Sequence, residues 1–106
     1  MKLISYDGVA AITTDEVADA ILDLAVAIAR FNRYEQVAVP VVVAGVREQL
    51  TLMLGPTIHV SSLTASTVAP VEIEGASETA EEIRQRAQAI SDPLHAVDGL
   101  PDVWSA

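Results

Sequence analysis

Two short apolar segments open the chain on either side of a polar dipeptide. Residues 3–6 and 9–12 flank Asp7-Gly8. An Asp-Gly pair suits the positive φ angles of a type I′ turn, which joins adjacent antiparallel strands. The pattern predicts a β-hairpin, and an irregular arm that merely contains a turn is the alternative.

The next segment changes to a helical period. Thr13 and Glu16 have the spacing of a capping box, and a helix is expected over residues 14–33. Its large apolar residues fall on one face, which comprises Val17, Ile21, Leu24, Ile28 and Phe31. Smaller residues form a second stripe, made of Ala18, Leu22, Ala25 and Ala29. A surface helix needs only one apolar face, so this helix is expected to be covered on two sides.

From residue 36 onward the period becomes that of strands. The run Val37–Val43 is apolar on both faces, which favours a strand buried on each side. Pro40 has no N–H for a ladder and therefore favours an edge or a bulge, so the two signals conflict. Ala44-Gly45 is a candidate turn, and strands at 46–54 and 58–63 complete a three-strand antiparallel meander.

The remaining pattern adds a second helix. Residues 71–74 predict a short strand, and Ser77 is the expected N-cap of a helix over 78–90 with the narrow apolar stripe Ala80, Ile83, Ala87 and Ile90. The order predicts a two-layer α+β fold, in which two helices pack on an antiparallel sheet made of the N-terminal hairpin and a three- to four-strand meander. Residues 1–91 form the single domain. Residues 92–106 form a C-terminal tail, whose Trp104 is expected to dock on apolar surface.

Composition narrows the classes of partner. The 106 residues carry 15 acids against six Lys and Arg, a net charge of −9, which argues against nucleic acid and anionic membranes. An apolar content of 51% is too high for a disordered acidic tail. No transmembrane or signal segment is recognisable, so a cytoplasmic location is expected, and the Ala- and Val-rich composition is typical of GC-rich bacterial coding.

Candidate chemistry is sparse. The chain has no cysteine, and its two histidines lie far apart in the sequence without a second ligand at helical or hairpin spacing, so no metal site is expected. The glycines are scattered at turns, which excludes a phosphate-binding loop and leaves no expected cofactor. His59 and Ser61 share one face of a strand and are the weak candidates for a small hydrolase site. A half-exposed structural histidine is the ordinary alternative.

The acids come in two groups without intervening bases, namely Asp7, Asp15, Glu16, Asp19 and Asp23, and then Glu72, Glu74, Glu78, Glu81 and Glu82. Both groups surround expected helix N-termini, where negative charge is stabilised by the helix dipole. The alternative is an acidic patch that binds a basic protein partner, as an inhibitor does.

Adding up the apolar faces predicts self-association. The second helix is too short to cover both the alanine-rich stripe of the first helix and the far side of the sheet, so one apolar surface stays open. Two-fold pairing is the commonest way to close such a surface. The sequence therefore predicts a non-enzymatic homodimer with interface candidates Ala18, Leu22, Ala25, Ala29, Val37, Val39, Pro40 and Val42. A binding module, either an acidic patch or a small apolar cup, and a hydrolase centred on His59 are the alternatives.

Overall fold

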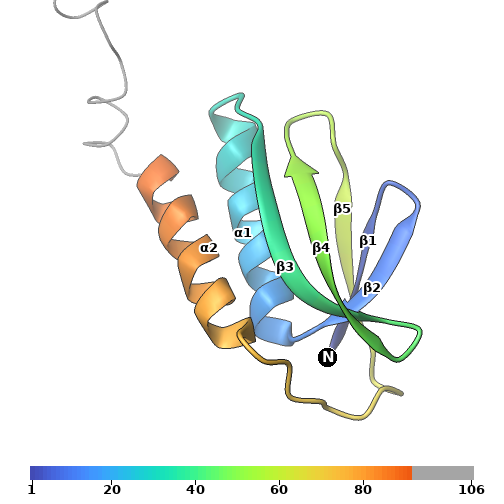
Figure 1. Ribbon diagram of the computed structural model, residues 1–106. Coiled ribbons are helices and arrows are strands. Elements are labelled where there is room, and N and C mark those ends of the chain that lie inside the picture. The colour runs from blue at the N-terminus through green and yellow to red at the C-terminus, as the bar shows by residue number, and fades with distance from the viewer. Residues whose placement is uncertain (92–106) are drawn as a thin grey trace, which may run out of the picture.

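Two helices pack on one face of a five-stranded antiparallel sheet, which confirms the α+β fold class (Figure 1). A computed structural model of the chain describes residues 1–91. Its helices are α1 (Asp15–Arg30) and α2 (Ala76–Ser91). Its strands are β1 (Lys2–Tyr6), β2 (Val9–Thr13), β3 (Glu35–Val43), β4 (Val46–Leu54) and β5 (Val60–Thr64). The spatial order of the strands is β4-β3-β2-β1-β5.

Two tight turns build the two hairpins. Asp7 and Gly8 have φ angles of 45° and 81°, and Ala44 and Gly45 have φ angles of 50° and 80°. Positive φ at both central residues is the mark of a type I′ turn, whose twist matches that of the flanking strands. The hairpin expected from Asp7-Gly8 is therefore confirmed, and so is the turn at Ala44-Gly45.

The last strand takes a different neighbour from the one that a simple meander gives it. β5 pairs with β1, so that Ser62 lies opposite Ile4, and β4 is left as the other edge of the sheet. This pairing places β1 inside the sheet, where Ile4 is buried at 1% exposure. β5 therefore does not pair with β4, the strand that precedes it in the chain. Pairing with β1 is favoured instead, because it covers the second edge of this apolar strand.

Pro40 lies where the hydrogen-bond ladder between β2 and β3 is interrupted. β3 is an interior strand, but its register with β2 contains only the pair Ile12 and Val42. Counted from the two-residue turn, Pro40 and Gln49 form a pair without mutual hydrogen bonds, so the nitrogen of Pro40 points toward β2 and has no hydrogen to donate. The expected edge or bulge is thus replaced by an interrupted ladder. Thr13 bridges the interruption by donating its hydroxyl to the Pro40 carbonyl at 2.9 Å.

The core lies between α1 and the concave face of the sheet. Val17, Ile21, Leu24 and Ile28 of α1 are fully buried, as the helical period predicts. They pack against strand residues that include Ile4, Val37, Val39, Val41, Leu52 and Leu54. Phe31 was expected on the same face, but it is the C-cap of α1 and remains 43% exposed.

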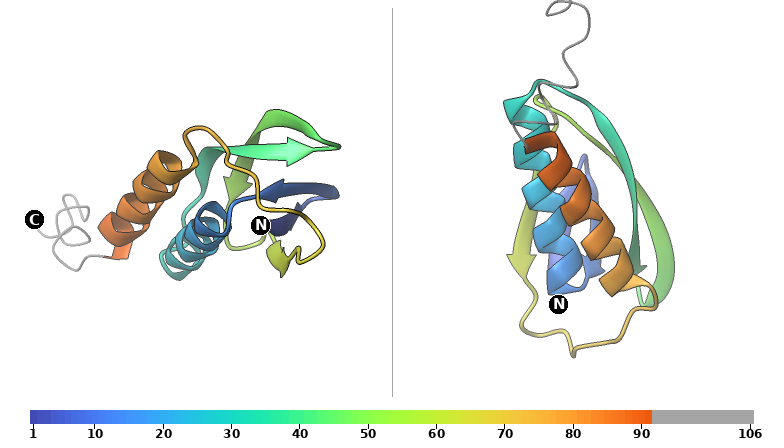
Figure 2. Two further views of the ribbon diagram at one scale, coloured as in Figure 1. Left: turned by 90° about the horizontal axis from the view of Figure 1, so that it is seen from below. Right: turned by 90° about the vertical axis from the view of Figure 1, so that its left-hand side faces the viewer.

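The second helix packs beside the first and touches the sheet at β3 (Figure 2). Its buried residues include the expected stripe of Ala80, Ile83, Ala87 and Ile90. The helix begins at Ala76, so the expected N-cap at Ser77 is wrong. The strand expected at 71–74 is also wrong: this segment is irregular, and only Ile73 is buried.

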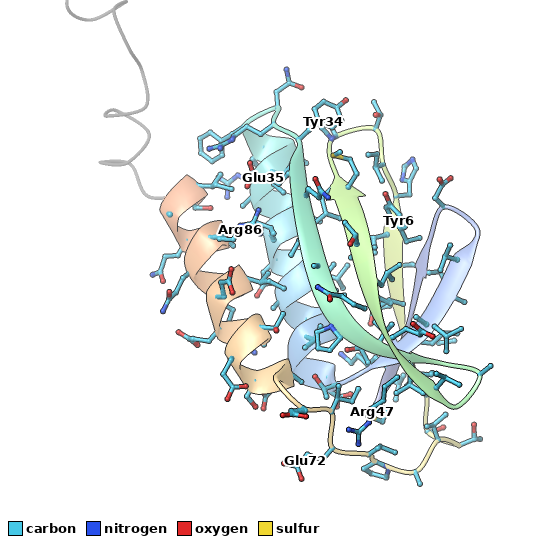
Figure 3. The ribbon with its side chains drawn as sticks, viewed as in Figure 1. Tyr6, Tyr34, Glu35, Arg47, Glu72 and Arg86 are labelled. Atoms are coloured by element: carbon cyan, nitrogen blue, oxygen red, sulfur yellow. The ribbon has the colours of Figure 1, made fainter. Side chains whose placement is uncertain are left out.

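An ion pair fixes α2 against the start of β3 (Figure 3). Arg86 donates to the Glu35 carboxylate at 2.8 Å and to the Gln36 carbonyl at 3.1 Å. Arg33 approaches the other carboxylate oxygen of Glu35 at 3.3 Å. The expected C-terminal tail and the docking of Trp104 lie outside the described residues.

Candidate functional site

The helices cover only the concave face of the sheet, and both lie on the same side of the strands (Figure 2). Side chains alternate along each strand, so the register assigns the residues of the convex face. These are Leu3, Ser5, Ala10, Ile12, Gln36, Ala38, Pro40, Val42, Arg47, Gln49, Thr51, Met53, Ser61 and Leu63. Arg47 is the single charged residue among them. In a chain with 15 acids, this face is almost free of charge.

The convex face also carries exposed apolar side chains. Leu63 is 66% exposed, which is the highest value among the exposed large hydrophobic residues of the described chain, and Met53 is 43% exposed. Depletion of charge together with exposed apolar residues distinguishes the centre of a protein interface from ordinary surface. The convex face is therefore the main candidate for a functional surface.

One end of this face is hollowed. A groove of about 470 Å³ lies between the β3–β4 hairpin and the segment after β5, and its apolar lining includes Ile12, Val42, Val68 and Val71. Arg47 stands at its rim and donates to the Glu72 carbonyl at 3.1 Å (Figure 3). The segment around Glu72 is thereby held against the hairpin and shields part of the convex face.

The eight interface candidates fall in different places. Ala18, Val37 and Val39 are buried in the core of the single chain, so no partner can contact them. Pro40 and Val42 are half-buried on the convex face. Leu22 and Ala25 are half-buried and Ala29 is exposed, all three on one flank of α1. The sequence assigned four of them to a stripe of the first helix and four to the strand over residues 37–43, and the structure divides them between the core, the sheet and the helix.

The flank of α1 that bears Leu22, Ala25 and Ala29 lies away from α2. Asp23 and Val26 instead share a shallow pocket with α2, which places α2 on the opposite flank. α2 also contacts β3, whereas α1 contacts β1 and β5. The flank with Ala25 and Ala29 therefore lies toward the edge strand β5.

The weak catalytic candidates are not built into a site. His59 is exposed and lines a shallow surface depression with Tyr6, Asp7, Thr57 and Ile58. Ser61 is exposed on the convex face. Among the described residues no hydrogen bond joins the two side chains, and no carboxylate orients the imidazole as a catalytic triad requires.

A neighbouring serine has a more unusual environment. Ser62 faces the helix side of β5, opposite Ile4, and its Oγ is buried without a hydrogen-bond partner in residues 1–91. Leaving a buried hydroxyl unpaired costs about 1–3 kcal/mol. The strand register places Ser62 on the helix side of the sheet and Ser61 on the convex face. The sequence around the two serines does not show this difference.

The fold brings parts of the two acidic groups together. Glu16 of α1 lines one surface depression with Glu72, Glu74 and Glu78, where the N-termini of both helices lie. No group of three or more metal-ligating side chains suited to an ion is found in residues 1–91. The charge at this end is a surface feature, stabilised by the two helix dipoles.

Comparison with protein-family models, with curated proteins and with solved structures finds no match for this chain. Neither described helix has the length and apolar character needed to cross a bilayer.

Proposed function

We propose that this chain is a small, non-enzymatic module that associates with a second copy of itself through the sheet surface that its helices leave uncovered. The observation that carries the proposal is the near absence of charge on the convex face, where Arg47 is the single ionic residue. A net charge of −9 makes two copies repel each other. They approach most favourably where each presents uncharged and apolar surface.

The test is a matched pair of charge insertions. Leu63 on β5 and Val26 on α1 are both highly exposed, at 66% and 60%. Leu63→Asp should raise the dimer dissociation constant at least about tenfold, because a carboxylate buried in an interface loses its hydration. Val26→Asp should leave it unchanged. Light scattering or sedimentation of both variants and the unmodified chain measures the effect.

The masses decide the proposal. A dimer has twice the mass of the 11.2 kDa chain. If the unmodified chain has the monomer mass at about 100 μM, self-association is wrong. Equal weakening by the two substitutions would also contradict it, because net charge rather than the convex face would then control assembly.

A second candidate function is binding of a basic protein at the acidic end. Its support is the convergence of Glu16, Glu72, Glu74 and Glu78 around one depression. Such binding weakens as salt screens the charges. The double variant Glu72→Gln/Glu74→Gln should reduce affinity for a lysine-rich protein more than Glu81→Gln/Glu82→Gln, which removes the same charge from α2. Equal losses would show that only net charge matters.

A further inference from the structure

The groove at the end of the convex face differs from other hollows of the described surface in the charge of its lining. Four other depressions on residues 1–91 each include at least one carboxylate, and these belong among others to Asp7, Glu16, Asp23 and Glu48. The groove between the β3–β4 hairpin and the segment after β5 includes none, and Arg47 is its only charged side chain. Of these five hollows, it is therefore the one whose electrostatics suit an anion.

The Arg47 guanidinium is held in place without being neutralised. Its Nη2 donates to the Glu72 carbonyl at 3.1 Å, which occupies one of the five N–H donors of a guanidinium (Figure 3). Within residues 1–91, no carboxylate lies within 4.0 Å of Arg47, whereas Arg33 and Arg86 each pair with one. The remaining N–H donors of Arg47 have no acceptor in the part of the chain described, so they can bind an anionic group.

The rest of the groove is suited to an aliphatic chain. Ile12, Val42, Val68 and Val71 line it, and its volume of about 470 Å³ is that of a small-ligand site. Val71 is 45% exposed, so the lining is open to solvent. An apolar cavity with one polar group at its rim is the usual design of such sites, because burial supplies affinity and the polar group fixes orientation.

We propose that this groove binds a free monocarboxylate with an aliphatic chain, whose carboxylate contacts Arg47 and whose chain lies against the valines. A carboxylate matches the planar guanidinium, with which it forms two parallel hydrogen bonds. A single negative charge is favoured over a phosphate dianion, because the net charge of −9 repels each added negative charge. The inference goes beyond the proposed self-association and does not depend on it, since one copy contains every residue that lines the groove.

Two amphiphiles of opposite charge test the proposal. Decanoate and decylammonium have aliphatic chains of the same length. The net charge of −9 attracts the cation and repels the anion unless a local cation reverses the preference. Isothermal titration calorimetry should show that the unmodified chain binds decanoate more tightly than decylammonium. Tighter binding of decylammonium overturns the proposal, because overall charge rather than Arg47 then selects the ligand.

A matched pair of variants tests the role of Arg47. Arg47→Gln removes the cation and should raise the dissociation constant for decanoate about fivefold. Arg30→Gln makes the same change of charge at the exposed end of α1, outside the groove, and should leave the dissociation constant unchanged. Equal weakening by the two substitutions overturns the assignment of the carboxylate to Arg47.

A second pair of variants tests the apolar lining. Val71→Asp places a carboxylate among the valines, so binding of decanoate should be lost. The exposed position of Val71, outside every strand and helix, makes the fold tolerant of the change. Val26→Asp, at a 60% exposed position of α1, is the control and should bind decanoate like the unmodified chain. Undiminished binding by Val71→Asp overturns the proposal.

Methyl NMR locates the ligand. Decanoate should shift the signals of Ile12, Val42, Val68 and Val71, and shifts confined to other methyl groups overturn the site. Light scattering at the same protein concentration separates this inference from self-association. A monomer that binds decanoate in the groove supports the site and contradicts self-association, whereas a dimer that binds no decanoate overturns the site and leaves self-association standing.

Discussion

The two edges of the sheet differ in how their backbone groups are occupied. At β4, the Met53 amide donates to the Tyr6 hydroxyl at 2.9 Å, although Tyr6 belongs to β1 (Figure 3). Arg47 on the same strand is held by the Glu72 carbonyl at 3.1 Å. At β5, by contrast, no charge or proline interrupts the strand, and the Ser62 hydroxyl is unpaired within the described chain. One outward amide of β4 is thus bonded within the molecule, whereas no hydrogen bond to an outward backbone group of β5 is found in residues 1–91.

This difference shows that the residue composition of an edge strand is not enough to judge whether the edge is free to pair with another strand. β4 has nine residues and a largely uncharged convex side, so it resembles a free edge in the sequence. Contacts from β1 and from the segment after β5, which are remote in sequence, change that. A short strand such as β5 can therefore be the more available edge.

The largest effect on stability is expected at the junction of β2 and β3, which joins the part of the sheet that ends at β4 to the part that ends at β5. Thr13 is fully buried, and its hydroxyl satisfies the Pro40 carbonyl. Thr13→Val keeps the shape but leaves that carbonyl without its partner, and it should lower the free energy of unfolding by about 2 kcal/mol. Urea denaturation measures the loss. Thr51→Val, at an exposed position of β4, is the control and should change stability by less than about 0.5 kcal/mol.

A smaller effect is expected when the β4 edge is opened. Tyr6→Phe removes the acceptor of the Met53 amide and should cost about 1 kcal/mol. Amide exchange at Met53 should become faster, so that β4 comes to resemble β5. Tyr34→Phe is the control because the Tyr34 hydroxyl contacts only an exposed threonine, Thr57, at 3.3 Å. Unchanged exchange at Met53 would show that the Tyr6 contact does not protect this edge.

Local signals predicted most elements of the fold from the sequence. Asp7-Gly8 predicted a turn because few residues accept positive φ, and the 3.6-residue period of Val17, Ile21, Leu24 and Ile28 predicted the buried face of α1. The partner of β5 was not predictable from local pattern, because pairing depends on which long-range contact buries more surface. The segment 71–74 alternates like a strand, but it meets the β3–β4 hairpin through the Arg47 side chain, which donates to the Glu72 carbonyl, and forms no strand ladder.

The candidate surface was predicted in part. The sequence indicated that one apolar face would stay open, and the structure places α2 beside α1 with the convex sheet face uncovered. It could not indicate which valines lie on that face, since Val39 and Val42 differ only in parity. Neither could it single out Ser62, because the lack of a partner for its hydroxyl arises from tertiary packing.

The two hairpin turns allow a matched comparison, in which a still smaller change in the free energy of unfolding is expected. Asp7 and Ala44 occupy the same turn position at φ values of 45° and 50°, but alanine tolerates this region less well than Asp or Asn. Ala44→Asn should therefore raise the free energy of unfolding by about 0.5–1 kcal/mol, and Asp7→Ala should lower it by a similar amount. Thermal and urea denaturation of both variants measure the pair. Destabilisation by Ala44→Asn would contradict the reasoning from φ.

The smallest effect on stability is expected at Lys2, which begins β1, the strand that pairs with β5. Its ammonium donates to the Asp19 carboxylate at 2.7 Å, and this hydrogen bond raises the pKa of Lys2 above the ordinary value of 10.5. A raised pKa in the folded state means that the contribution of the contact is complete below pH 10.5 and is lost as pH rises through the folded-state pKa. The stability difference between the unmodified chain and Lys2→Met should thus be constant from pH 7 to about 9.5 and shrink toward pH 11.5. Urea denaturation across this range measures it, and the same series with Asp19→Asn should show the same decline, because either substitution removes the pair. A difference that stays constant to pH 11.5 would mean that the Lys2 charge does not stabilise the junction between α1 and β1.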